Sequence, residues 1–203
     1  MGVTPRQFEA MRQRVAGEGR PAQAAGANPA PFAEAAAARR ILGVDPSLRG
    51  TGLGVIDTGD GAPRAMDFQV VNCPAGWSRS RCLARIAEVT REMIRQQAPE
   101  VCAVEGLFYA QNLQTALIMG EARGACLATV AGAGLEIYEL APRRVKQAIV
   151  GYGAAGKPAV GRMVQRLLAL EAAPPADAAD ALALALVFAQ EQKRFALHPP
   201  RRV

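Results

Sequence analysis

The chain has 203 residues, 50% of them hydrophobic, and a formal net charge of +6 from 24 Lys and Arg against 18 Asp and Glu. This length and composition allow one sizeable core, and no stretch approaches the roughly 18 apolar residues of a membrane helix, so a membrane-spanning protein is excluded. The basic balance favours a polyanionic partner, of which nucleic acid is one candidate.

Histidine and cysteine usage narrows the chemistry further. The only histidine, His198, lies in a Pro/Arg-rich tail, which argues against a His-based zinc site or a Ser-His-Asp triad. The cysteines are widely spaced, with no Cys-x-x-Cys pair. We interpret them as reduced thiols of a cytoplasmic protein, and they are Cys73, Cys82, Cys102 and Cys126.

The two ends of the chain differ in composition from the rest. Residues 1–40 are rich in Ala, Pro, Gly and Arg, and we predict a disordered extension there. An organellar transit peptide, or a start codon assigned too far upstream, would show the same composition. Residues 193–203 are expected to form a basic tail, which leaves residues 41–192 as a single folded domain.

The folded domain begins with short β-rich runs. Residues 41–45, 52–57 and 65–71 predict three antiparallel strands in a meander. Residues 78–97 follow as an amphipathic helix with a proline just past its end. Residues 101–105 then indicate a buried strand, which we expect to run parallel to the first.

The second half of the domain is predicted to be mainly helical. Residues 111–132 indicate a helix that is small or apolar nearly all round, so it must be covered on two sides. A strand at residues 135–140 and helices at residues 142–150, 157–170 and 176–190 complete the order. This order predicts an α/β fold whose mixed central sheet has helices on both faces.

Four acidic residues stand where a fold could bring them together. Asp45 and Glu105 each close an apolar run that we predict to be a strand. Asp177 and Asp180 lie three apart at the start of the last helix, so both carboxylates point from one face. Carboxylates at such positions are costly unless cations compensate them, so we expect divalent metal ions there.

Simpler interpretations of these residues stay open. Asp45 leads into a glycine-rich turn over residues 46–54, where it could cap its own backbone or, as in actin-like ATPases, cradle a phosphate. Glu105 could be a solvated strand end. Phe108 and Tyr109 follow it and could either pack in the core or stack on an unpaired base. The two helical acids could simply complement the helix dipole.

Basic residues gather between the acidic elements of the sequence. Lys146 and Lys157 flank residues 150–156, and with Arg143 and neighbouring arginines they form the densest basic cluster of the folded part. Such residues can be a solvated helix face, or they can hold phosphates against the acids. We therefore count Arg143, Lys146 and Lys157 as candidate DNA-binding residues.

These motifs together resemble the RuvC family, the bacterial crossover-junction endodeoxyribonucleases that resolve Holliday junctions. The resemblance runs from about residue 41 to residue 189. It rests on five motifs in order: GVDPSLRGTGLGVI (43–56), VEGLFYAQN (104–112), ARGA (122–125), PRRVKQAIVGYG (142–153) and ADAADALALAL (176–186). It implies an RNase H-like fold and a homodimer that cuts two strands of like polarity symmetrically at a four-way DNA junction.

The resemblance also assigns roles to residues. Two Mg²⁺ or Mn²⁺ ions would be held by four acids, which are Asp45, Glu105, Asp177 and Asp180. The junction DNA would be contacted by a stacking aromatic and two lysines, which are Phe108, Lys146 and Lys157. The helix over residues 111–132 would be the dimer surface. The family further implies cooperation with the RuvA and RuvB branch-migration proteins.

The chain departs from the family pattern at a few positions. Ser47 and Leu48 stand where a Gly-Ser pair is often found, Tyr109 directly follows the stacking aromatic, and Asp177 stands where some members carry His. None of these removes a proposed catalytic group. Two other functions are retained as alternatives: a fragment of an actin-like ATPase, and a non-catalytic junction-binding protein, for which Asp45→Asn would change nothing.

Overall fold

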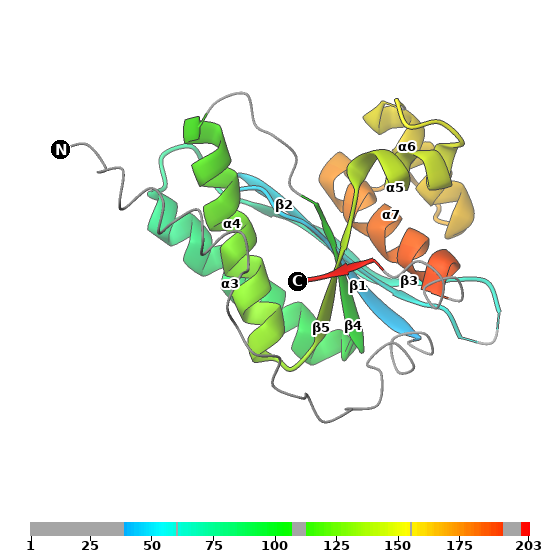
Figure 1. Cartoon of the computed structure of the whole chain (residues 1–203), viewed down its shortest axis with the longest axis horizontal. Helices are drawn as coiled ribbons and strands as arrows, with labels where there is room; N and C mark the ends of the chain where they lie inside the picture. The colour runs from blue at the N-terminus through cyan, green and yellow to red at the C-terminus, as the bar shows by residue number, and fades with distance from the viewer. Residues whose placement is uncertain (1–38, 60, 107–112, 155, 193–199) are drawn as a thin grey trace, which may run out of the picture. The chain divides into compact units, whose positions relative to one another are not determined.

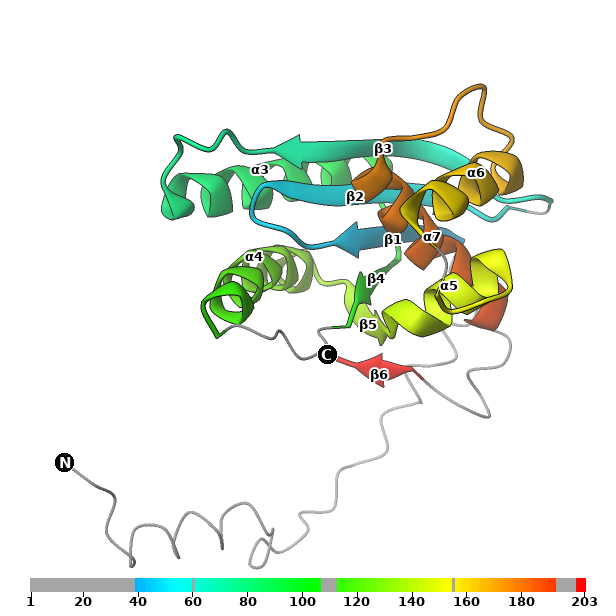
Figure 2. The ribbon, with the colours of Figure 1, turned by 90° about the horizontal axis from the view of Figure 1, so that it is seen from above.

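The computed structural model describes residues 39–59, 61–106, 113–154, 156–192 and 200–203. These residues build a six-stranded sheet with the strand order β3-β2-β1-β4-β5-β6 (Figure 2). β1, β2 and β3 form an antiparallel meander, β4 runs parallel to β1 and to β5, and β6 is antiparallel to β5. The strands are β1 (Arg40–Asp45), β2 (Gly50–Asp57), β3 (Arg64–Asn72), β4 (Val101–Glu105), β5 (Glu136–Leu140) and β6 (Arg201–Arg202).

Helices cover both faces of this sheet (Figure 1). One face carries α3 (Arg79–Gln97) and α4 (Leu113–Gly132). The other carries α5 (Pro142–Val150), α6 (Lys157–Leu167) and α7 (Ala176–Glu191). The predicted fold class, a mixed α/β sheet with helices on both faces, is confirmed, and so are the meander and the parallel pairing of β1 with β4.

The alternation of side chains along β1 divides the core into two layers. Leu42 and Val44 pack with buried residues of α3 and α4, whereas Ile41 packs on the opposite face with α7. Because α7 lies between the sheet and its neighbouring helices, residues 181–188 of α7 are all buried. This explains why its sequence is apolar without interruption.

Among the described residues, α4 is covered on one side only. Its buried side chains are Ala122, Arg123, Cys126 and Val130, so none lies in its first nine residues. Near its beginning, Leu113 is 76% exposed and Leu117 is 59% exposed. The apolar helix therefore keeps an uncovered surface, although its sequence predicts covering on two sides.

Glycines on β1 and β2 allow the backbone of α7 to approach the sheet closely. A Cβ atom on Gly43 would lie 1.8 Å from the carbonyl oxygen of Ala181, and one on Gly52 would lie 1.9 Å from that of Asp177. Side chains cannot occupy such positions without displacing the helix. The turn predicted over residues 46–54 is shorter than expected, because β2 begins at Gly50 and Gly52 pairs with Asp45 inside the sheet.

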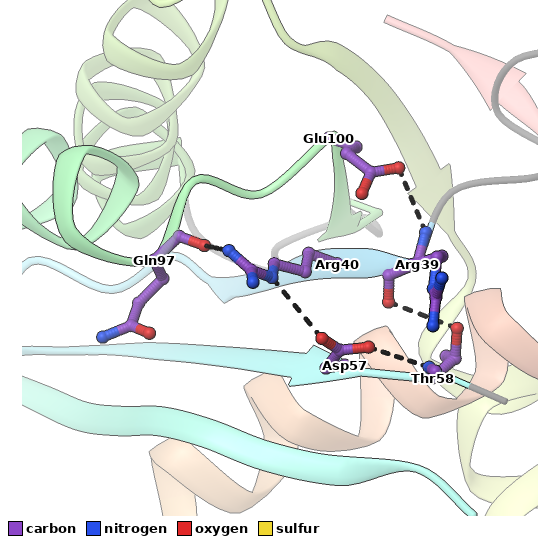
Figure 3. A network of polar contacts seen from close by, with 7 residues as sticks. Arg39, Arg40, Asp57, Thr58, Gln97 and Glu100 are labelled. Carbon is purple, nitrogen blue, oxygen red and sulfur yellow. Dashed lines mark hydrogen bonds and ion pairs between the residues drawn. The ribbon is translucent and has the colours of Figure 1, made fainter. Parts of the chain in front are cut away.

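A polar network fixes the end of the sheet where β1 begins (Figure 3). Arg40 contacts Asp57 with its Nε atom at 3.4 Å and donates from Nη1 to the carbonyl oxygen of Gln97 at 3.1 Å. The backbone N–H of Arg39 donates to the carboxylate of Glu100 at 3.1 Å. These contacts join β1, β2 and the end of α3, so they help to hold the strand whose other end carries Asp45.

Several element boundaries differ from the sequence-based prediction. The helix predicted over residues 157–170 ends at Leu167, and Ala169 adopts a left-handed conformation with φ of 50°. β6 was not predicted, because its two residues lie in the segment interpreted as a basic tail. Of the described helices, none combines the length and the apolar character needed to cross a membrane.

Candidate metal centre

Two neighbouring parallel strands end in acidic residues. Asp45 is the last residue of β1 and Glu105 is the last residue of β4, and the register pairs Val44 with Val104 directly before them. The carboxyl ends of parallel strands meet at one edge of the sheet, so the two acids stand side by side. Both are only partly exposed.

The first turns of α7 bring two more acids to the same edge. The close approach of α7 to Gly52 places Asp177 and Asp180 over the end of β1. One carboxylate oxygen from each of Asp45, Asp177 and Asp180 lies within 4.8 Å of the other two. Glu105 ends the neighbouring strand beside this group, near enough to Asp45 for its charge to raise the pKa of that acid. The structure therefore brings together all four acids that the sequence singles out.

Burial and nearby charges raise the pKa of three carboxyl groups, those of Asp45, Glu105 and Asp180. Burial, followed by the charges of Glu105 and Asp180, raises the pKa of Asp45 from 3.8 to about 8. Burial likewise raises the pKa of Glu105 and that of Asp180. Without a cation, burial and the neighbouring carboxylates therefore favour the protonated form of Asp45.

The donor set suits a hard divalent cation. All four side chains offer carboxylate oxygens, which are the ligands that Mg²⁺ and Mn²⁺ prefer, and no soft sulfur ligand belongs to the cluster as described. A bound cation would favour the ionised carboxylates and offset the repulsion among them. The residues therefore fit a metal of this class.

One lysine contacts the cluster directly. The Nζ atom of Lys157 lies 2.9 Å from Oδ1 of Asp177 and 3.2 Å from Oδ2 of Asp180. Partial burial disfavours the ammonium, but the hydrogen bond to Asp177 and the charge of Asp180 outweigh it and raise the pKa of Lys157. Lys157 is thus charged and paired with two of the four acids.

The other predicted DNA-binding residues lie at different distances from the acids. Lys146 is half-buried on α5 and is near enough for its charge to oppose, in part, the effect of burial on the pKa of Glu105. Arg143 is exposed on the same helix and lies against Gly153 of the following loop. Phe108 and Tyr109 lie outside the described residues.

Comparison with known proteins identifies the family. The model of the family described as crossover junction endodeoxyribonuclease RuvC matches residues 41–188. This chain belongs to the RuvC family. The RuvC of Moorella thermoacetica is 45% identical to it over 150 residues, which are 73% of this chain and 90% of that protein. The RuvC of Alkalilimnicola ehrlichii is 44% identical over 147 residues, which are 72% and 88% of the two chains.

Solved structures agree with this assignment. Thermus thermophilus RuvC in complex with a Holliday junction substrate is similar to this chain with a TM-score of 0.73 and 32% identity, over 81% of this chain and 99% of that one. The yeast mitochondrial Holliday junction resolvase Ydc2 aligns over 97% of this chain and 90% of its own with a TM-score of 0.55. At 13% identity, Ydc2 supports the fold alone. The expected RNase H-like fold of the RuvC family is confirmed.

One buried residue beside the acids was missed by sequence reasoning. Arg123 of α4 is 6% exposed, donates from Nη1 to the backbone oxygen of Glu105, and pairs through Nη2 with Oε2 of Glu139 at 2.6 Å. It therefore fixes the end of β4, from which the Glu105 side chain projects. The signal was a single Arg within an otherwise small and apolar helix, in the ARGA motif of the RuvC resemblance.

Proposed function

We propose that this protein is a Holliday junction resolvase that hydrolyses phosphodiester bonds in two strands of like polarity, with divalent metal ions as cofactors. One observation carries the proposal. In a chain of the RuvC family, Asp45, Asp177 and Asp180 offer carboxylate oxygens within 4.8 Å of one another, and Glu105 ends the strand next to that of Asp45. An actin-like ATPase fragment leaves these four acids without a common role.

The four acids divide the work of holding the metal. Asp45 contacts Glu105 on one side and shares the ligand cluster with Asp177 and Asp180 on the other, so it is the acid best placed to bridge two ions. Two Mg²⁺ or Mn²⁺ ions, when bound, would supply an activated water and stabilise the leaving oxygen. The acids are only partly exposed, which limits the access of solvent to the ligands.

Basic and aromatic residues are proposed to hold the DNA. Arg143 and Lys146 lie on α5, and Lys157 lies on α6 against Asp177 and Asp180; all three would contact phosphates near the cut. Phe108 and Tyr109 are proposed to stack on unpaired bases of the junction. Phosphate contacts fix the position of the DNA, so they supply affinity and not sequence preference.

The uncovered surface of α4 is proposed to form a homodimer. Leu113 and Leu117 are exposed there, and a Cβ added to Gly120 or Gly124 would meet nothing within 4 Å, so a second copy could pack closely. A two-fold dimer would place two identical sites across a two-fold junction, which accounts for symmetric cutting.

Further partners and the location of the protein follow from the family and from its thiols. The RuvA and RuvB branch-migration proteins are proposed partners. The free cysteines are buried and suit a reducing compartment such as the cytoplasm.

Cleavage of a synthetic four-way junction tests the proposal. Wild-type protein and Asp45→Asn are compared on a labelled junction in Mg²⁺, in Mn²⁺ and in EDTA, with linear duplex of the same sequence as control. We expect nicks only from the wild type, only with metal, and preferentially in the junction. Binding without cutting by both proteins, across several junction sequences, would instead support a non-catalytic junction-binding protein.

A further inference from the structure

The ammonium group of Lys157 lies directly on two of the proposed metal ligands. Its Nζ atom is 2.9 Å from Oδ1 of Asp177 and 3.2 Å from Oδ2 of Asp180. These two acids belong to the group of three whose oxygens lie within 4.8 Å of one another. The ammonium group of Lys157 therefore contacts carboxylate oxygens that a divalent ion would need as ligands.

The side chain of Lys157 is free to move, whereas its backbone is fixed. Lys157 is the first residue of α6, and that helix is anchored by the buried residues Val160, Gly161 and Val164, with Gly161 close to Ala179 of α7. The Lys157 side chain is 56% exposed, so its contacts with the two acids, and not packing, determine where the ammonium lies. Losing those contacts would release the group without disturbing the helix.

Metal and ammonium cannot both keep full contact with the same carboxylates. A divalent ion repels a neighbouring ammonium and draws the lone pairs of both carboxylates to itself. Lys157 is charged at neutral pH, so it cannot avoid this repulsion by remaining where it is. Binding of one cation must weaken the contacts of the other.

We infer that Lys157 is an internal competitor of the metal: it pairs with Asp177 and Asp180 until a divalent ion binds, and is then released towards the DNA phosphates. This inference rests on the proposed function, because it requires a metal at the four acids. Its consequence is a coupling between ligands. Metal binding frees a phosphate-binding lysine, and DNA that holds this lysine favours metal binding by the same factor.

Calorimetric titration with Mn²⁺ in the absence of DNA tests the competition without measuring activity. Lys157→Met keeps an unbranched side chain of similar length but removes its charge. We expect Mn²⁺ to bind roughly five- to tenfold more tightly to this variant, because it has lost a partly exposed ion pair shared by two acids. Lys146→Met is the matched control. Within the described residues, Lys146 forms no ion pair with an acid, so its replacement removes a nearby charge without removing a competitor.

The outcomes separate the inference from the proposed function. Tighter binding by Lys157→Met with little change in Lys146→Met supports competition. Equal or weaker binding by Lys157→Met, in a protein whose Mn²⁺ binding is abolished by Asp177→Asn, overturns the inference and leaves the metal centre intact. An equal gain in Mn²⁺ affinity in Lys157→Met and Lys146→Met also overturns the inference, because the loss of any nearby positive charge would then explain it. Unchanged Mn²⁺ binding in Asp177→Asn would overturn both.

A second measurement tests the coupling to DNA. Junction affinity is measured in Ca²⁺ and in EDTA for the wild type, Lys157→Met and Lys146→Met. We expect the gain in affinity from Ca²⁺ to be larger for the wild type than for Lys157→Met, because only the wild type has a lysine to release. The same gain in both would contradict the release of Lys157 towards the DNA.

Discussion

Replacing Asp45 with Asn is expected to stabilise the metal-free protein at alkaline pH. The folded structure raises the pKa of Asp45 from 3.8 to about 8, chiefly through burial and then through Glu105 and Asp180. A folded-state pKa above the unfolded value means that the folded state binds the proton more tightly. The associated stability is fully present below pH 4 and is lost as the pH rises through 8. Asn has no proton to lose, so its contribution does not change across this range.

The size of the effect follows from the change in pKa. From 3.8 to about 8 is a rise of about four pH units, which corresponds to at most about 6 kcal/mol at about 1.4 kcal/mol for each unit. The charge of Glu105 contributes to this rise and the charge of Lys157 opposes it, so the free energy does not belong to Asp45 alone. We therefore expect Asp45→Asn to gain about 2 to 3 kcal/mol relative to the wild type between pH 5 and pH 9.

Urea unfolding in EDTA, followed by circular dichroism at pH 5, 7 and 9, measures this difference. Asp67→Asn on β3 is the control, because it makes the same chemical change away from the acidic cluster. Parallel pH profiles of the unfolding free energy for the wild type and Asp45→Asn would show that the folded structure does not raise the pKa of Asp45. So would a variant that is less stable than the wild type at pH 9.

Three further substitutions test the fold, the support of the site and the dimer. Gly52→Ala places a Cβ 1.9 Å from the backbone oxygen of Asp177, so we expect a loss of more than about 3 kcal/mol in urea unfolding, and a loss below 1 kcal/mol would contradict the close approach. Arg123→Met leaves Glu139 without its closest partner and should cost about 3 kcal/mol in the same assay, whereas a neutral result would show that the pair is dispensable. Leu117→Arg should give a monomer by light scattering with an unchanged circular dichroism spectrum, and a persisting dimer would exclude this surface of α4.

The positions of the acids could be predicted because each one interrupts a regular pattern. Asp45 and Glu105 end apolar runs at strand ends, and neighbouring parallel strands must end at the same edge of the sheet. Asp177 and Asp180 share one helix face by their spacing. Hydrophobic periodicity therefore located β1, β4 and α7 in the sequence, and the order of the elements was sufficient to predict that their acids meet.

Other features depend on contacts between distant residues and leave little trace in the sequence. The ion pairs of Lys157 with Asp177 and Asp180 span 20 or more residues, so the lysine was assigned to DNA only. Arg123 is buried because Glu139 and the Glu105 carbonyl meet it there. The register of β6 likewise follows from the pairing of Arg201 with Glu139 and of Arg202 with Glu136.

Two glycines and one departure from the family pattern likewise depend on contacts between distant residues, so the sequence alone did not explain them. Gly52 was assigned to a glycine-rich turn, although its function in the fold, like that of Gly43, is to lack a side chain beneath α7. Leu48 stands where a serine is common in the family, and it is buried among residues of α3 and β2. The apolar choice is explained by that packing.

Anomalous X-ray scattering from crystals soaked in Mn²⁺ is the first test of the metal centre at the four acids, because it locates the ions without relying on activity. We expect manganese peaks at about 2.1 Å from carboxylate oxygens of Asp45, Glu105, Asp177 and Asp180, with Asp45 contacting both ions if two are present. Their absence from this cluster at saturating Mn²⁺, or peaks at other acids alone, would contradict the assignment of a metal centre at the ends of β1 and β4.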